Sequence, residues 1–170
     1  MTVSEANLDN SEVSFHGFPW PLRLRYVMEN AHNLAEARSI WSHTNNTAAF
    51  NFLIGSSSDA GTPGSPAAMA LETMKDFTGY FYDNSPIEAN ATWQWPNVST
   101  PEKIGFPIKD AVWRSNHALH PFVMHTQENL WNDTIWRYKE LHDLITYVIP
   151  PLEEDLKQKK ITYENDTIEI

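Results

Sequence analysis

The chain of 170 residues contains no cysteine. It therefore has no thiol of its own to form a disulfide, a thiolate zinc site, an iron–sulfur cluster or a nucleophile. It also has no apolar run close to the roughly 20 residues that cross a bilayer. Residues 1–20 lack both the basic and the apolar region of a secretory signal, so we expect no signal peptide within this segment.

Basic residues are few. Twelve Lys and Arg stand against twenty-two Asp and Glu, which gives a net charge of −10. This charge argues against nucleic acid as the main partner and against docking on an anionic membrane by charge alone. The hydrophobic fraction of 41% and the aromatic fraction of 12% are enough to build a buried core, so we expect a globular chain.

Five Asn residues lie in Asn-x-Ser/Thr acceptor sequences for N-glycosylation. They are Asn45, Asn90, Asn97, Asn132 and Asn165. One explanation is a composition rich in Asn and Thr. The other is a lysosomal or secreted glycoprotein whose surface loops carry glycans. We favour the second.

The spacing of apolar residues predicts a chain of mixed helices and strands. Within the stretch 21–44, which is expected to be helical, Asn33 is followed three residues later by Glu36. This is the spacing of a helix N-terminal capping box, so we expect a second helix to begin there. Strands are expected over 1–9, 47–58, 67–74 and 76–82, the last two as a hairpin, and helix over 21–44.

The second half of the chain is expected to be less regular. Residues 83–110 read as an insertion loop, 111–117 as a short strand, and 151–170 as a polar tail. A final helix is expected to be capped by Asn132 or Asp133 and to bury Ile135, Tyr138, Leu141, Ile145 and Val148. The fold class is therefore α+β, in a single domain over 1–170.

One candidate site residue lies within an apolar strand. If Phe50 and Phe52 face a core, Asn51 faces the opposite side of the sheet. Its amide could donate a hydrogen bond to an oxyanion that develops during catalysis. The alternative is a structural Asn at a sheet edge, which the residues alone favour.

Polar and aromatic groups offer three further candidates. His117, His120 and His125 are spaced like metal ligands, but with no acidic partner nearby a His-rich loop is favoured and no metal is expected. Arg137 in the first turn of a helix opposes the helix dipole, so it pairs either with a specific anionic group or with a surface carboxylate. Trp93 and Trp95 line a ligand pocket or pack the insertion.

Five segments in this order resemble the penicillin acyltransferase-like family of N-terminal-nucleophile amide hydrolases and acyltransferases. They are Gly17-Phe18-Pro19, Phe50 to Gly55, Glu72-Thr73, Ser115-Asn116-His117 and Thr134 to Arg137. The resemblance implies a four-layer αββα sandwich that acts on the carbon–nitrogen bond of linear amides without a cofactor. An N-acyl substrate is also expected.

The resemblance also implies roles for individual residues. Asn51 would be an oxyanion-hole donor, Arg137 a pocket residue near the nucleophile, and Asn116 and His117 neighbours of the site. The family's nucleophile is an N-terminal cysteine freed by self-cleavage, with its own α-amine as the base. This chain has no cysteine, so it resembles an interior fragment whose nucleophile is carried by a companion chain of the same precursor.

A second class of function remains open. The chain could be a non-catalytic secreted glycoprotein domain that binds a ligand or partner through the insertion around Trp93 and Trp95. A companion chain that begins with cysteine would favour the enzyme, whereas a natural product consisting of this chain alone would favour the binding domain.

Overall fold

The computed structural model describes residues 1–62 and 65–148. Its centre is an antiparallel sheet with the strand order β1-β2-β3-β4. The strands are β1 (Thr2–Asn7), β2 (Phe50–Gly55), β3 (Ala68–Met74) and β4 (Phe77–Phe81). All four coincide with predicted strands, and β3 and β4 form the expected hairpin.

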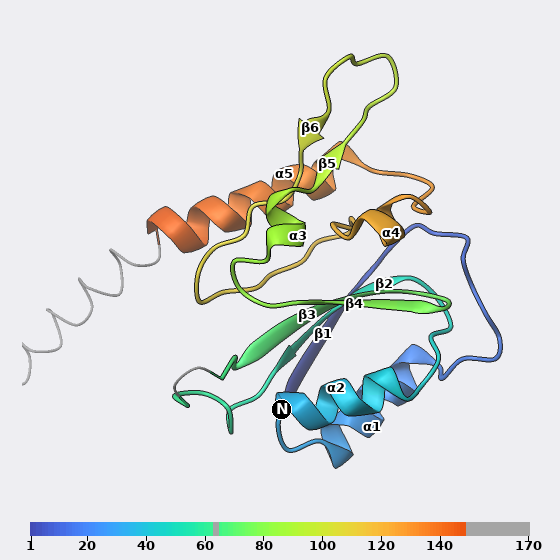
Figure 1. Ribbon diagram of the computed structural model, residues 1–170, viewed down its shortest axis with the longest axis vertical. Helices are drawn as coiled ribbons and strands as arrows, with labels where there is room; N and C mark the ends of the chain where they lie inside the picture. Colours follow the sequence, from blue (N-terminus) through green and yellow to red (C-terminus); the bar gives the residue numbers. More distant parts are fainter. Residues whose placement is uncertain (63–64, 149–170) are drawn as a thin grey trace, which may run out of the picture.

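Two helices cover one face of this sheet (Figure 1). They are α1 (Trp20–Asn30) and α2 (Leu34–Ser42), and both lie between β1 and β2 in the chain. Trp41 of α2 packs its ring on Phe52 of β2, with ring centroids 4.7 Å apart, and both side chains are buried. Burial of a large apolar side chain contributes about 1.5–3 kcal/mol. The predicted core-facing side of β2 is therefore confirmed.

Asn33 separates the two helices, as its spacing to Glu36 predicts. Its side-chain oxygen accepts a hydrogen bond from the backbone N–H of Glu36 at 2.9 Å. The Glu36 carboxylate accepts from the backbone N–H of His32 at 2.8 Å, one residue earlier than in a standard capping box. Both bonds supply partners for backbone groups at the start of α2.

Removal of this cap gives a first testable prediction. Asn33→Ala is expected to lower the free energy of unfolding by about 1 kcal/mol, because an N–H at the start of α2 loses its acceptor. Urea unfolding followed by circular dichroism measures the change. Asn33→Ser keeps an oxygen in place and is expected to retain most of the stability; an equal loss in both variants would contradict the capping role.

The other face of the sheet, here called the second face, is covered by the chain that follows β4 (Figure 1). This layer contains α3 (Pro86–Ala89), β5 (Thr92–Trp93), β6 (Glu102–Lys103), α4 (Pro121–Met124), α5 (Asn132–Asp143) and a π-helical turn (Leu144–Val148). Trp113 and Tyr138 of this layer pack in one core cluster with Ala70 and Phe81 of the sheet. The described residues thus form an α+β fold with five α-helices.

Two expectations for the second half need correction. Residues 83–110 are not a plain loop, since they hold α3 and the two-stranded β5–β6 sheet. Residues 111–117 do not form a strand; only an isolated bridge joins Ile108 and Ala111. The carbonyls of Ser115 and His117 accept hydrogen bonds from the Asn51 side chain of β2 rather than from a neighbouring strand. The predicted tail, 151–170, lies outside the described residues.

Helix α5 matches its predicted position, with two differences. It begins at Asn132, and the residue at its N-cap is Trp131, whose side chain makes no capping bond. Ile135 and Tyr138 are buried as expected, whereas Leu141 is 38% exposed. Across the described residues, no helix is both long and apolar enough to span a membrane.

Candidate functional site

A charged side chain stands in the middle of an apolar strand. Glu72 of β3 lies directly opposite Asn51 of β2 in the antiparallel register. Opposed residues in such a pair point to the same face of the sheet. Both side chains are therefore on the second face, away from α1 and α2, and both are buried.

Glu72 belongs to a buried ionic cluster centred on Arg114. The Arg114 Nε atom lies 3.3 Å from a Glu72 carboxylate oxygen, and its Nη1 atom lies 3.1 Å from a Glu88 oxygen. The guanidinium also lies over the ring of Phe81, 4.4 Å from its centroid. Because the three charged side chains are at most 3% exposed, water contributes little to their solvation.

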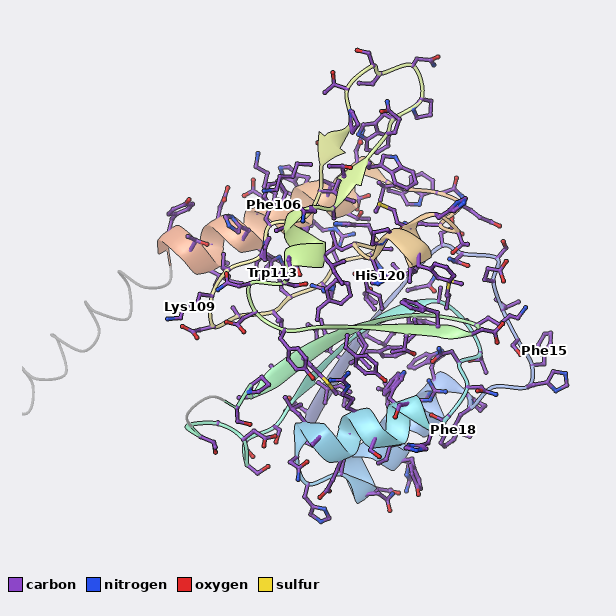
Figure 2. All side chains as sticks on the ribbon, in the orientation of Figure 1. Phe15, Phe18, Phe106, Lys109, Trp113 and His120 are labelled. Carbon is purple, nitrogen blue, oxygen red and sulfur yellow. The ribbon has the colours of Figure 1, made fainter. Side chains whose placement is uncertain are left out.

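The Glu72 carboxylate has further partners in the backbone. It accepts hydrogen bonds from the N–H of Leu119 at 2.9 Å and from the N–H of His120 at 2.7 Å. Burial raises the pKa of Glu72, and the neighbouring guanidinium and these N–H groups oppose that rise. His120 and Trp113 both lie on the α5 side of the sheet (Figure 2).

Tyr138 of α5 completes the cluster. Its hydroxyl donates to the Glu88 carboxylate, and burial raises the pKa of this phenol, so it stays protonated as a donor. Gly105 packs against the backbone of Glu88 so closely that a Cβ there would collide with the Glu88 carbonyl. The ionic cluster thus joins four parts of the fold: β3 through Glu72, α3 through Glu88, the segment 111–117 through Arg114, and α5 through Tyr138.

Asn51 holds two backbone carbonyls of the second-face layer. Its Nδ2 atom donates to the carbonyl of Ser115 at 2.7 Å and to the carbonyl of His117 at 2.9 Å. Both amide hydrogens are thus engaged in this conformation. Strand β2 lies between β1 and β3, so Asn51 is in the interior of the sheet rather than at its edge.

Loss of these two bonds gives a second prediction. Asn51→Ala is expected to lower the free energy of unfolding by about 2 kcal/mol, because the carbonyls of Ser115 and His117 stay buried without donors. Chemical denaturation measures the change. Asn30→Ala is the control, since its amide makes one exposed bond to a backbone carbonyl. Similar small losses in the two variants would contradict a buried structural role for Asn51.

His117 is a buried, neutral histidine. Its Nδ1 atom lies 3.0 Å from the Ser115 hydroxyl and 3.1 Å from the Thr134 hydroxyl. Burial lowers the pKa of His117 to about 4. The Ser115 hydroxyl donates its hydrogen to the Thr134 carbonyl, so it is not arranged as a nucleophile whose proton passes to His117. Within the described residues, no three His, Asp or Glu side chains are grouped to hold a metal ion.

Asn116 and Arg137 meet at the rim of the second-face layer. Arg137 donates from Nη2 to the Asn116 side-chain oxygen at 3.1 Å, and also bonds the Asp133 carboxylate one turn earlier on α5. Asn116 donates to the carbonyl of Asn7 at the end of β1. The Arg137–Asp133 pair is partly exposed, so Arg137 has the surface carboxylate partner that the sequence allowed for.

Two hollows lie outside these groups. The larger, of about 830 Å³, is lined by 65–68, Tyr82, Asp83 and 110–112. The smaller, of about 360 Å³, lies between the β5 strand and α4 and is lined by Trp93, Gln94, Pro121, Met124, His125 and Gln127. Neither contains Asn51, His117 or Arg137.

The sequence indicated some members of the site and not others. Asn51, Asn116, His117 and Arg137 were singled out, and the structure links them by direct contacts or through adjacent backbone. Nothing in the sequence marks Glu88, which lies in the expected loop 83–110, and Tyr138 is expected only as a buried core residue of the final helix. A charged residue within an apolar strand is unusual, and this is the signal from which Glu72 can be found in the sequence.

Comparison with family models, curated proteins and solved structures found no match to this chain.

Proposed function

We propose that this chain is part of an N-terminal-nucleophile amidohydrolase or acyltransferase that acts on the carbon–nitrogen bond of linear amides. One observation carries the proposal. Asn51 bonds the carbonyls of Ser115 and His117, the two neighbours of Asn116, and Asn116 contacts Arg137. Residues from three remote segments, which the resemblance associates with one site, are thus connected.

A four-layer αββα sandwich is part of this proposal. The α1–α2 layer and the four-stranded sheet would be its first two layers, and the second-face layer would form the other two together with strands from the companion chain. The nucleophilic cysteine and its α-amine would come from that chain, which is required because none of the 170 residues is a cysteine. Acyl transfer of this kind needs no cofactor.

The contacts support different roles for the two asparagines. Asn51 holds the segment that carries Asn116, and it would become an oxyanion donor only by exchanging one carbonyl partner for the substrate oxygen. Asn116 and Arg137 are more accessible, and would contact the substrate directly. Lysosomal or secreted localisation, which the acceptor sequences favour, completes the proposal.

The test is purification of the protein from its natural source, with N-terminal sequencing and intact mass of every chain. The expected result is a companion chain that begins with cysteine, together with hydrolysis of a fluorogenic N-acyl amide. Asn116→Ala and Arg137→Gln are expected to lower kcat/KM by about tenfold or more, since they contact substrate in the transition state. Arg25→Gln, in an exposed pair with Glu29, is the control.

A natural product that consists of this chain alone would contradict the enzyme proposal. The second candidate function is then a non-catalytic glycoprotein domain that binds a ligand through the groove between β5 and α4. The observation that favours it is the groove itself, which Trp93, Pro121 and Met124 line with apolar surface. Trp93→Ala would abolish such binding, and an unchanged affinity would contradict this second function.

A further inference from the structure

Four of the five acceptor asparagines lie in the described residues, and all four are exposed. They are Asn45, Asn90, Asn97 and Asn132. Asn165 lies outside the described residues. Asn132 differs from the others in its surroundings, because the indoles of Trp131 and Trp136 beside it are 62% and 63% exposed. Two large aromatic side chains in water need an explanation.

Helix geometry brings one of these indoles close to Asn132. Asn132 and Trp136 are four residues apart in α5, so they are neighbours on the helix surface. Side chains in a helix lean toward its N-terminus, and a residue covers the turn that precedes it. A side chain at position 136 is therefore expected over the turn that begins with Asn132, and Trp131 adjoins Asn132 in the chain.

We propose that Asn132 carries an N-linked glycan whose first sugar rings cover the indole of Trp136. The glycan comes from a lipid-linked oligosaccharide. The Asn132 amide nitrogen forms a bond to C1 of the first N-acetylglucosamine, the C1–O bond to the lipid pyrophosphate breaks, and the amide loses one proton as the lipid pyrophosphate leaves. The occupant of the exposed aromatic surface is thus a saccharide attached to the same helix.

The burial of Thr134 sets the order of events. Thr134 supplies the hydroxyl of this acceptor sequence, and a transferase must reach it. In the folded chain it is buried, lies 3.1 Å from His117 Nδ1 and donates to the Trp131 carbonyl. The glycan must therefore be attached before α5 packs on the rest of the layer. In the acceptor sequence of Asn90 the hydroxyl belongs to Thr92, which is exposed. A transferase can therefore reach it after the chain has folded.

The experiment uses the full natural precursor, expressed in a eukaryotic secretory host. Glycopeptide mass spectrometry is expected to find Asn132 occupied, and pulse–chase labelling to find the glycan attached before protease resistance develops. Asn132→Gln is expected to lower Tm by about 2–4 °C, the shift expected for about 1 kcal/mol in a domain of this size. Asn90→Gln, which removes a glycan without an adjacent exposed indole, is the matched control with little expected shift.

A double variant separates the sugar–indole contact from other effects. Trp136→Ala is expected to lower Tm in the glycosylated protein and to have little effect when Asn132→Gln is also present. An unmodified Asn132, attachment after protease resistance, or equal effects of Trp136→Ala in both backgrounds would each overturn the proposal. This inference rests on the secretory or lysosomal localisation in the proposed function. None of these measurements uses amide hydrolysis, so their failure would leave the proposed enzymatic activity untouched.

Discussion

Arg114→Met is expected to lower the free energy of unfolding by about 3–5 kcal/mol, the range for removal of one partner from a buried ionic group. Met has a similar length, so the space is largely filled, but Glu72 and Glu88 lose their only guanidinium partner. Both carboxylates then remain buried close to each other. Urea unfolding at neutral pH, followed by Trp fluorescence, measures the loss.

The loss should depend on pH in a specific direction. Burial already raises the pKa of Glu72, and removal of the Arg114 charge raises it further. A carboxyl that binds a proton more tightly in the folded state loses stability as the pH rises. The difference between Arg114→Met and the natural protein is therefore expected to grow from acidic to neutral pH. Arg25→Met, in an exposed ion pair, should change nothing measurable; a small, pH-independent loss in Arg114→Met would contradict the buried cluster.

Acidification from pH 7 to pH 4 is expected to remove about 3 kcal/mol of stability through His117 alone. Burial lowers its pKa from 6.5 to about 4 in the folded chain. The unfolded state therefore binds more protons between these two values, and stability falls as the pH falls through this window. Below pH 4 both states are protonated and the His117 contribution stops changing.

His117→Gln isolates this effect. Glutamine keeps a neutral polar group in the site and does not titrate, so its unfolding free energy should fall less steeply between pH 6.5 and pH 4. The contribution of Glu72 to the pH dependence of stability has the opposite sign. It is present in both proteins, so it cancels when their slopes are compared. His43→Gln, at an exposed position, is the matched control for the loss of one histidine. Parallel slopes in the natural protein and His117→Gln would contradict a buried neutral His117.

The sheet could be predicted from the sequence because its strands alternate clearly or are bounded by turn residues. Phe52 and Ile54 mark the core face of β2, and Asn33 marks the start of α2. The strand expected over 111–117 did not form. Its polar groups bond to side chains from distant elements, and local periodicity contains no information on such contacts.

The site was predictable only where residue type was unusual for its position. Asn51 within an apolar strand stood out, although its two carbonyl partners lie 64 and 66 residues later in the chain. Glu88 and Tyr138 gave no such signal, because an acidic residue in an expected loop and an aromatic residue on the apolar face of an expected helix are both ordinary. Their pairing depends on how α3 and α5 pack, which is a tertiary property.

The ionic cluster has a consequence for how long the folded chain lasts. Glu72, Glu88, Arg114 and Tyr138 belong to four separate segments, so their contacts close only when the hairpin, α3, the segment 111–117 and α5 have all docked. Interactions that form after the rate-limiting step of folding act mainly on the unfolding rate. We therefore expect this cluster to govern the lifetime of the native state more than the speed of folding, so that Arg114→Met unfolds faster and refolds almost normally.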